Sequence, residues 1–322
     1  MASRGIILVA LLLAAGPAVA QTRAPQPNWW SAPAREDGPP RIVWAARHSP
    51  ETPYRAPNKP IWRIAGILKA HAGKKSWDQP VLLNRDFDGH YISMAPGEKS
   101  KCLFYADDRA FGWVYSGQVK VTIDGQEPKI LSKGWAFNVA PRLAYCLETV
   151  GDAPAVFFRG TPAGQAPSYP ESETPTPMKG YTYEKAKITS TGGYDAINAP
   201  FFNIDDYGAS DRSGERFLFD GHTSANPRRD VAIADLPPPS DWGHFHANMA
   251  EAWVVVYGQI DVLISGGGLV HGDYGDVINV PEERWHRATS APGSGKSIRL
   301  SLISRSKEGQ VLFLQADGAT GN

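Results

Sequence analysis

Short runs of alternating apolar and polar residues dominate the chain from about residue 61 onward. In GWVYSGQVKVTIDGQ, Val119, Val121 and Ile123 alternate with polar residues between glycine turns. A period of two is typical of strands with one buried face. Similar runs follow along the chain: WAFNVAP, AVFFRG, DVAIADL, EAWVVVY, QIDVLIS, DVINVP, RWHRATS and SIRLSLIS. The pattern predicts an all-β fold, with short helices expected only near residues 61–72 and 204–211.

Two segments interrupt this pattern. Residues 21–60, which include QPNWWSAPAREDGPP, are rich in proline and tryptophan and have neither strand nor helix periodicity. We expect an extended arm, because the tandem tryptophans need a surface to pack against. Residues 161–180, TPAGQAPSYPESETPTPMKG, lack apolar periodicity and are typical of an interdomain linker.

The two halves of the strand-rich region repeat one another at a constant offset of 141 residues. Gly117-Gln118 falls on Gly258-Gln259, and Asn138-Val139 falls on Asn279-Val280, without a gap. Val119, Val121, Ile123 and Gly134 likewise fall on Ile260, Val262, Ile264 and Gly275. Apolar alternation alone would match many strands, whereas the shared turn and the Asn-Val pair favour a tandem duplication of one β domain.

The first twenty residues have the form of a secretory signal peptide. MASR supplies a positive charge, GIILVALLLAA an apolar core, and AVA before Gln21 a small-residue cleavage pattern. A membrane anchor is the alternative, but the apolar stretch is short for a span and Gly16-Pro17 interrupts it. No later stretch is apolar enough to cross a bilayer. We therefore expect a periplasmic or secreted mature protein.

Composition excludes some partners and suggests one covalent link. The chain has 322 residues, 42% of them hydrophobic, with 33 basic and 33 acidic residues. This balance gives no sign of nucleic-acid binding. The only cysteines, Cys102 and Cys146, suit one disulfide in an oxidising compartment, and two buried thiols are the alternative.

The residues most suggestive of chemistry lie in GHFHANMAEAWVVVYG, residues 243–258. His244 and His246 would share one face of a strand, and Glu251 follows them after a turn. His286, in GDVINVPEERWH, is a fourth candidate. A lone histidine on a strand is more often structural than a ligand, but four candidates at these spacings favour a metal site. Three imidazoles and one carboxylate suit a divalent transition metal (Fe, Mn, Ni, Cu or Zn) and leave positions for water or substrate.

The pattern His-x-His-x4-Glu-x6-Gly, followed by Gly-Asp-x4-Pro-x4-His, resembles the two signature motifs of the cupin superfamily. The motif residues are His244, His246, Glu251 and Gly258, then Gly275, Asp276, Pro281 and His286. With the internal repeat, the chain is similar to a bicupin, which implies two tandem jelly-roll β-barrels. The resemblance covers roughly residues 85–160 and 205–316, with the motifs only in the second half.

The resemblance and the segment boundaries together divide the chain into five parts. Residues 1–20 form the signal peptide, residues 21–60 the arm, and residues 61–160 an N-terminal barrel. Residues 161–180 form the linker, and residues 181–322 a C-terminal metal-binding barrel.

Two positions depart from the cupin pattern. Glu283 stands two residues after the motif proline, where cupins usually carry glycine, so the turn before His286 is expected to differ in shape. The asparagine often found a few residues after the last histidine is also missing.

The N-terminal barrel lacks the ligands of its partner. At the repeat offset, the four ligand positions hold Leu103, Tyr105, Ala110 and Tyr145. This barrel therefore cannot hold the same metal. The cysteines sit beside two of these positions, on strands that the cupin fold brings close together. The resemblance thus implies a disulfide that stabilises the metal-free barrel.

Several residues near the ligands are candidates for contact with a substrate. Trp253 and Tyr257 would share the strand face of Glu251 and line the cavity, with plain core packing as the alternative. Arg284, which shares parity with His286, could meet a substrate carboxylate or phenolate, with a solvated position as the alternative. Asn248 could orient a ligand.

Three functions suit this site. The first is a dioxygenase acting on a small organic substrate, for which the aromatic residues of the expected cavity favour an aromatic molecule. Glu251 would be both a metal ligand and the catalytic base. The second is a redox-neutral isomerase, lyase or decarboxylase. The third is a periplasmic protein that binds a ligand or metal without turnover. Of the three we favour the dioxygenase. The chain is also a candidate to form a homo-oligomer, because exposed edge strands of jelly rolls often pair.

Overall fold

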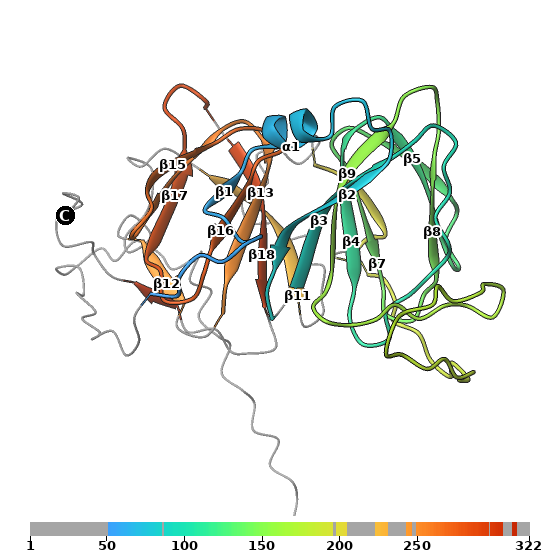
Figure 1. Cartoon of the computed structure of the whole chain (residues 1–322). Helices are drawn as coiled ribbons and strands as arrows, with labels where there is room; N and C mark the ends of the chain where they lie inside the picture. The colour runs from blue at the N-terminus through green and yellow to red at the C-terminus, as the bar shows by residue number, and fades with distance from the viewer. Residues whose placement is uncertain are drawn as a thin grey trace, which may run out of the picture. The chain divides into compact units, whose positions relative to one another are not determined.

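The computed structural model describes residues 51–85, 87–195, 198–204, 223–230, 243–246, 249–295, 297–304 and 311–313 (Figure 1). The expected signal peptide, most of the arm and Asn248 lie outside these ranges. Across these ranges, no helix has both the length and the hydropathy to span a membrane. The helix expected near residues 61–72 is α1 (Ile64–Ala70), whereas nearly all of the one expected near 204–211 lies outside.

The N-terminal barrel consists of two antiparallel sheets. The larger sheet has the strand order β10 (Phe201–Asn203), β7 (Trp135–Val139), β4 (Ala110–Ser116), β9 (Ala155–Pro162), β3 (Phe87–Met94) and β2 (Trp77–Leu83). The smaller sheet has the order β6 (Lys129–Ser132), β5 (Gln118–Ile123) and β8 (Tyr145–Thr149). Apolar residues from both sheets form one buried cluster between them.

The C-terminal barrel repeats this arrangement. One sheet has the order β1 (Ile61–Trp62), β16 (Val277–Val280), β13 (Glu251–Tyr257), β18 (Ser297–Ser304) and β11 (Thr223–Asp230). The other has the order β15 (Gly268–Gly272), β14 (Ile260–Ile264), β17 (His286–Ser290), β12 (His244–His246) and β19 (Val311–Phe313). The predicted all-β fold of two tandem jelly-roll barrels is confirmed.

The internal repeat extends to backbone geometry. Arg142 and Glu283 occupy equivalent positions, and each has a φ of 63°. The amide of Arg142 donates to the carbonyl of Tyr105, and the amide of Glu283 donates to the equivalent carbonyl of His246, both at 2.8 Å. The turn before His286 therefore adopts the left-handed backbone that favours glycine, although neither barrel has glycine there.

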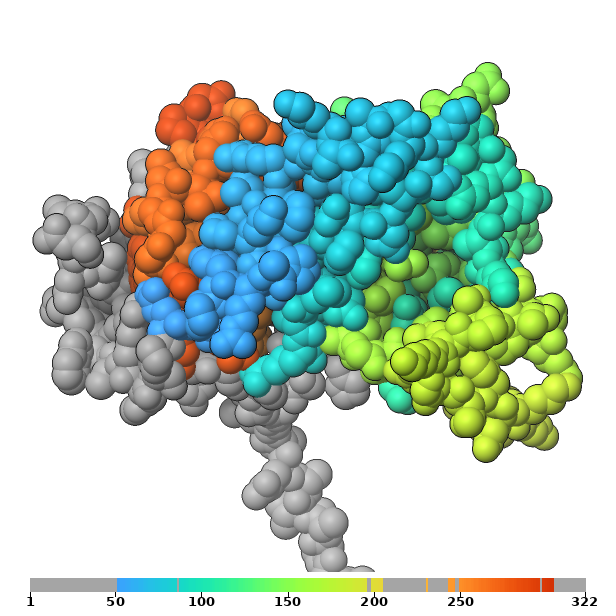
Figure 2. All heavy atoms as spheres, in the orientation of Figure 1, coloured from blue at the N-terminus to red at the C-terminus, as the bar shows by residue number. Residues whose placement is uncertain are grey.

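The two barrels exchange their N-terminal strands. Strand β1 pairs with β16 of the C-terminal barrel, although it precedes the N-terminal barrel in the chain. The residues before β1 follow the same path: the hydroxyl of Tyr54 donates to the carbonyl of Asn279, at 3.1 Å. We call residues 51–62 the N-terminal strap. In Figures 1 and 2 its blue segment lies among the orange elements. The N-terminal barrel thus begins later than residue 61, the boundary expected from the sequence.

The segment that follows the expected linker supplies the reciprocal strand. Strand β10 pairs with β7 of the N-terminal barrel, although it precedes the C-terminal barrel. The hydroxyl of Tyr194 donates to the carbonyl of Asn138, at 2.9 Å, as Tyr54 does to Asn279 in the other barrel. We call Tyr194 and β10 the linker strap. Each barrel is therefore completed by a segment that precedes the other barrel in the chain.

The six-stranded sheet of the N-terminal barrel and the β1–β16–β13–β18–β11 sheet of the C-terminal barrel share a third apolar cluster. The even-numbered residues Ala252 and Val254 of β13 face this cluster, together with Trp113 of β4. Strand alternation sends Trp253 and Val255 into the interior of the C-terminal barrel instead. A strand of each barrel thus has both faces buried, one inside the barrel and one against its neighbour.

A disulfide joins Cys102 and Cys146, as expected, with their Cα atoms 4.4 Å apart. Cys146 lies on β8, and Cys102 precedes an isolated bridge between Leu103 and Tyr145. The disulfide therefore links two neighbouring segments of the N-terminal barrel across 44 residues of sequence.

Candidate metal centre

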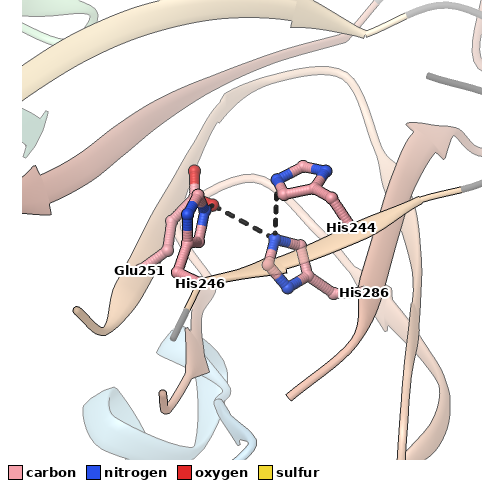
Figure 3. A group of neighbouring side chains, drawn as sticks. All are labelled: His244, His246, Glu251 and His286. Atoms are coloured by element: carbon pink, nitrogen blue, oxygen red, sulfur yellow. Dashed lines mark hydrogen bonds and ion pairs between the residues drawn. The ribbon is translucent and has the colours of Figure 1, made fainter. Parts of the chain in front are cut away.

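His244 and His246 lie on β12, a short strand between β17 and β19. Their side chains leave the strand on the same face, as its two-residue period requires (Figure 3). His286 opens β17 and is the direct register partner of His244. Three imidazoles are thus placed together by one antiparallel strand pair.

Glu251 reaches the imidazoles from the opposite sheet. It opens β13, where it is paired with Val280 of β16 and Ile303 of β18. The odd-numbered residues of β13 point into the barrel, so the Glu251 carboxylate faces β12 and β17 across the interior (Figure 3). The centre therefore spans both sheets of the C-terminal barrel.

The four side chains converge on a small volume. One ligand atom from each residue lies within 4.8 Å of all the others. Oε2 of Glu251 is 3.1 Å from Nε2 of His246 and 3.2 Å from Nε2 of His286. Nε2 of His286 is also 3.1 Å from Nε2 of His244. His244 is half-buried and the other three are buried, so the centre is reached from the side of His244.

One backbone contact determines the tautomer of His286. Its Nδ1 lies 2.9 Å from the carbonyl oxygen of Arg284, which can only accept a hydrogen bond. Nδ1 therefore carries a proton, and Nε2 is the ring nitrogen that faces His244 and Glu251. An imidazole oriented in this way binds a metal ion through Nε2 once that nitrogen is deprotonated.

The other carboxylate oxygen of Glu251 is held by two donors. Nε1 of Trp253 donates to Oε1 at 2.7 Å, and Oγ of Ser301 donates to the same atom at 2.5 Å. Burial raises the pKa of Glu251, but the hydrogen bonds and charges of His246 and His286 outweigh it and hold the pKa well below its usual value. Glu251 is thus an ionised ligand with Oε2 directed at the imidazoles.

These residues fit one divalent transition metal. Three imidazole nitrogens and one carboxylate oxygen form a mixed nitrogen and oxygen donor set that accepts Fe, Mn, Ni, Cu or Zn. Hydrogen bonds hold Nδ1 of His286 and Oε1 of Glu251, so each presents its remaining atom to the others. Such outer partners orient the ligands of established metal sites.

The structure places the expected substrate contacts differently. Trp253 is buried and serves Glu251 as a hydrogen-bond donor. Tyr257 packs against the cluster between the barrels, because a bulge between Val255 and Tyr257 breaks the alternation of β13. Arg284 turns away from the imidazoles.

The Arg284 side chain instead binds the N-terminal strap. Its Nε donates to the carbonyl of Thr52 at 2.9 Å, and its Nη1 donates to the carbonyl of Ser265 at 2.8 Å. Its Nη1 also pairs with Glu51, at 3.1 Å, and its guanidinium lies 4.5 Å from the ring centre of Tyr54. The left-handed residue before Arg284 ends the alternation that predicted an inward side chain.

Sequence reasoning missed Ser301 and Arg299, both on β18. Arg299 is buried, pairs with Asp230 and stacks 4.6 Å from the ring centre of Trp253. In SIRLSLIS, polar residues alternate with apolar ones inside a strand that is buried on both faces. From that alternation, the sequence could have predicted that β18 directs polar side chains into the barrel.

Comparison with known proteins finds distant structural neighbours and no family. No family model matches the chain, and no curated protein matches it significantly. Solved structures of similar fold include a deletion mutant of Bacillus subtilis oxalate decarboxylase, with 12% identity over 79% of each chain and a TM-score of 0.45. A cupin 2 conserved barrel domain protein from Leptotrichia buccalis has 12% identity over 72% of this chain and 90% of that one, with a TM-score of 0.47.

A third structure is the formate complex of Lactobacillus farciminis oxalate decarboxylase, with 13% identity over 72% of this chain and 82% of that one, and a TM-score of 0.44. The two barrels of this chain are established by its own strand pairing, and its resemblance to cupins rests on the sequence motifs. At these identities and TM-scores the neighbours carry no conclusion about the reaction, which is inferred from the chain's own residues.

Proposed function

We propose that the chain is a metal-dependent enzyme that binds a small organic substrate at His244, His246, Glu251 and His286. The observation that carries the proposal is the convergence of these four ligand atoms within 4.8 Å. A bound metal would supply Lewis-acid polarisation of a substrate oxygen and, with iron, manganese or copper, access to redox chemistry. The half-buried His244 marks the side from which the substrate enters.

The reaction class that best fits the site is redox-neutral: an isomerase, lyase or decarboxylase. The dioxygenase route expected from the sequence requires Glu251 to take a proton from the substrate. However, Oε1 of Glu251 already accepts hydrogen bonds from Trp253 and Ser301, and Oε2 faces the imidazoles, so both oxygens are already engaged. Glu251 is better suited to holding a metal than to moving a proton. A dioxygenase with another base is the alternative, favoured by a ligand set that accepts redox metals.

The first test is elemental analysis of the purified protein beside the His244→Ala/His246→Ala double variant. We expect about one transition metal per chain, absent from the double variant. A protein without metal after reconstitution would overturn the proposal and leave a ligand-binding barrel.

The second test separates the reaction classes. The metal-loaded protein is incubated with small hydroxy, keto and aromatic carboxylates, with and without oxygen, while oxygen uptake and carbon dioxide release are recorded. Turnover that continues without oxygen supports redox-neutral chemistry, and turnover coupled to oxygen uptake supports the dioxygenase. Ligand binding without turnover, which persists in His246→Ala, would identify a binding protein.

We also propose that the mature chain is exported. The disulfide between Cys102 and Cys146 supports this, because such bonds persist in oxidising compartments. Intact-mass analysis of the periplasmic fraction of a bacterial host should give a chain that begins at Gln21 and has two cysteines that resist alkylation. A full-length, reduced chain in the cytoplasmic fraction would contradict it.

A further inference from the structure

The N-terminal barrel carries a guanidinium where the C-terminal barrel has its metal centre. Arg159 on β9 is the register partner of Gly112 on β4. Ser301 on β18 is the register partner of Trp253 on β13, and Gly112 is the repeat equivalent of Trp253. Arg159 therefore stands in the place of the serine that contacts Glu251.

Two phenols surround this guanidinium. Tyr105 and Tyr145 take the places of His246 and His286 in the repeat. Burial raises the pKa of both tyrosines, and the positive charge of Arg159 works against that rise in each. The charge of Arg159 thus acts on both phenols from inside the barrel.

The guanidinium is incompletely paired by the protein. Its Nη2 lies 3.7 Å from Oδ2 of Asp78, whose other oxygen is 2.5 Å from Nδ1 of His90. Its Nε is buried and, among the residues that the structure describes, meets no hydrogen-bond acceptor. The position of Glu251 holds Ala110, so β4 supplies no carboxylate. Asp88 on β3 also faces this region and accepts a hydrogen bond from the amide of Gly164.

The site is open to solvent. The side chain of Arg159 is 25% exposed, and those of Asp78 and His90 are 51% and 21% exposed. Asp78 belongs to β2, the edge strand of the larger sheet, and no further strand among the residues that the structure describes pairs with its outer edge. A small molecule can therefore approach the guanidinium past the edge of the barrel.

Thr161 lies two residues after Arg159 on β9, on the same face, and its side chain is hydrogen-bonded to Tyr105. We propose that the N-terminal barrel binds a small carboxylate at Arg159, with the hydroxyls of Tyr105 and Thr161 beside it. A guanidinium presents parallel N–H donors that match the two oxygens of a carboxylate. Such a ligand would give the buried Nε of Arg159 a hydrogen-bond acceptor. Asp78 would keep its hydrogen bond to His90. A second site in the metal-free barrel does not depend on the function proposed for the metal centre.

The test uses the full-length chain carrying His244→Ala and His246→Ala, so that the metal centre contributes no binding. Acetate and benzoate are titrated by calorimetry at an ionic strength held constant with sodium chloride. We expect saturable binding of one carboxylate per chain, at least tenfold weaker after the further change Arg159→Gln. Arg159→Lys, which keeps the charge but loses the fork of donors, should bind with intermediate affinity.

Lys99→Gln is the matched control. Lys99 belongs to the same barrel, but its side chain is exposed and pairs with Glu148 at 3.1 Å. We expect its affinity for carboxylates to be unchanged. The absence of saturable binding up to tens of millimolar would overturn the proposal, as would equal binding by Arg159→Gln.

Discussion

At the scale of single residues, the metal centre depends on side chains that do not touch the metal position. Ser301 and Trp253 both donate to Oε1 of Glu251 and leave Oε2 directed at the imidazoles. Partners of this kind usually account for a factor of 10–100 in metal affinity.

We predict that Ser301→Ala lowers metal affinity about 10- to 100-fold, because one of the two donors to Glu251 is lost. Competition with a chelator of known affinity measures the change. Ser297→Ala is a matched control, because Ser297 lies on the same strand and is also buried, but no hydrogen bond joins it to Glu251 in the described structure. Equal affinities for the two variants would show that Ser301 does not position the carboxylate.

The ligands themselves were predictable from the sequence, whereas their supporting residues were only partly so. The spacing of His244, His246 and Glu251 follows from strand alternation and one turn, both of which are local. Ser301 lies fifty residues from Glu251 in sequence, so only the paired register of β13 and β18 brings them together. Tyr257 was misplaced because a bulge depends on the partner strand.

At the scale of elements, the N-terminal strap contacts and holds the loop that precedes His286. Arg284 binds the strap through its side chain and the imidazole of His286 through its carbonyl. The amide of Thr52 in the strap donates to the carbonyl of Glu282, at 3.3 Å. The sequence did not predict that the strap pairs with the C-terminal barrel, because the two residues of β1 are too few to show a strand pattern.

We predict that Arg284→Gln lowers the free energy of unfolding by about 1–3 kcal/mol, because Glu51 and the carbonyls of Thr52 and Ser265 lose the charged donor of a buried side chain. It should also weaken metal binding, since the loop that holds His286 is loosened. Urea unfolding and chelator competition measure the two effects. Arg142→Gln, which loosens the equivalent turn of the N-terminal barrel, should lower stability but leave metal affinity unchanged. Equal metal affinities for the two variants would contradict the coupling.

The disulfide is an element-scale constraint on the N-terminal barrel. We predict that Cys102→Ser/Cys146→Ser lowers the free energy of unfolding by about 3–4 kcal/mol, the loop-entropy value for a loop of this length. Denaturant unfolding measures the loss, and metal content should be unaffected because the ligands lie in the other barrel. A loss of metal together with the disulfide would show that the barrels are coupled more tightly than expected.

At the scale of the whole molecule, the apolar cluster between the six-stranded sheet of the N-terminal barrel and the sheet that contains β13 joins the barrels. Trp113 is fully buried there, with its ring centre 5.2 Å from that of Tyr274 in the C-terminal barrel. The hydroxyl of Tyr91 also donates to the carbonyl of Gly275, at 2.5 Å. The duplication was visible in the sequence, but this shared surface was not, because both faces of its strands are apolar.

We predict that Trp113→Ala lowers the free energy of unfolding by about 3–5 kcal/mol, through the cavity left in the shared cluster. Hydrogen exchange should show reduced protection in strands of both barrels. Reduced protection confined to the N-terminal barrel would contradict a shared core.

The exchanged straps also determine how the chain can fold during translation. The N-terminal barrel lacks its edge strand until β10, at residues 201–203, has left the ribosome. Strand β1 is made first, but its partner β16 is made more than two hundred residues later. The N-terminal strap therefore has no β16 to pair with until the whole N-terminal barrel has been synthesised. If the chain crosses a membrane as it is made, that waiting strand is what a chaperone of the receiving compartment would have to protect.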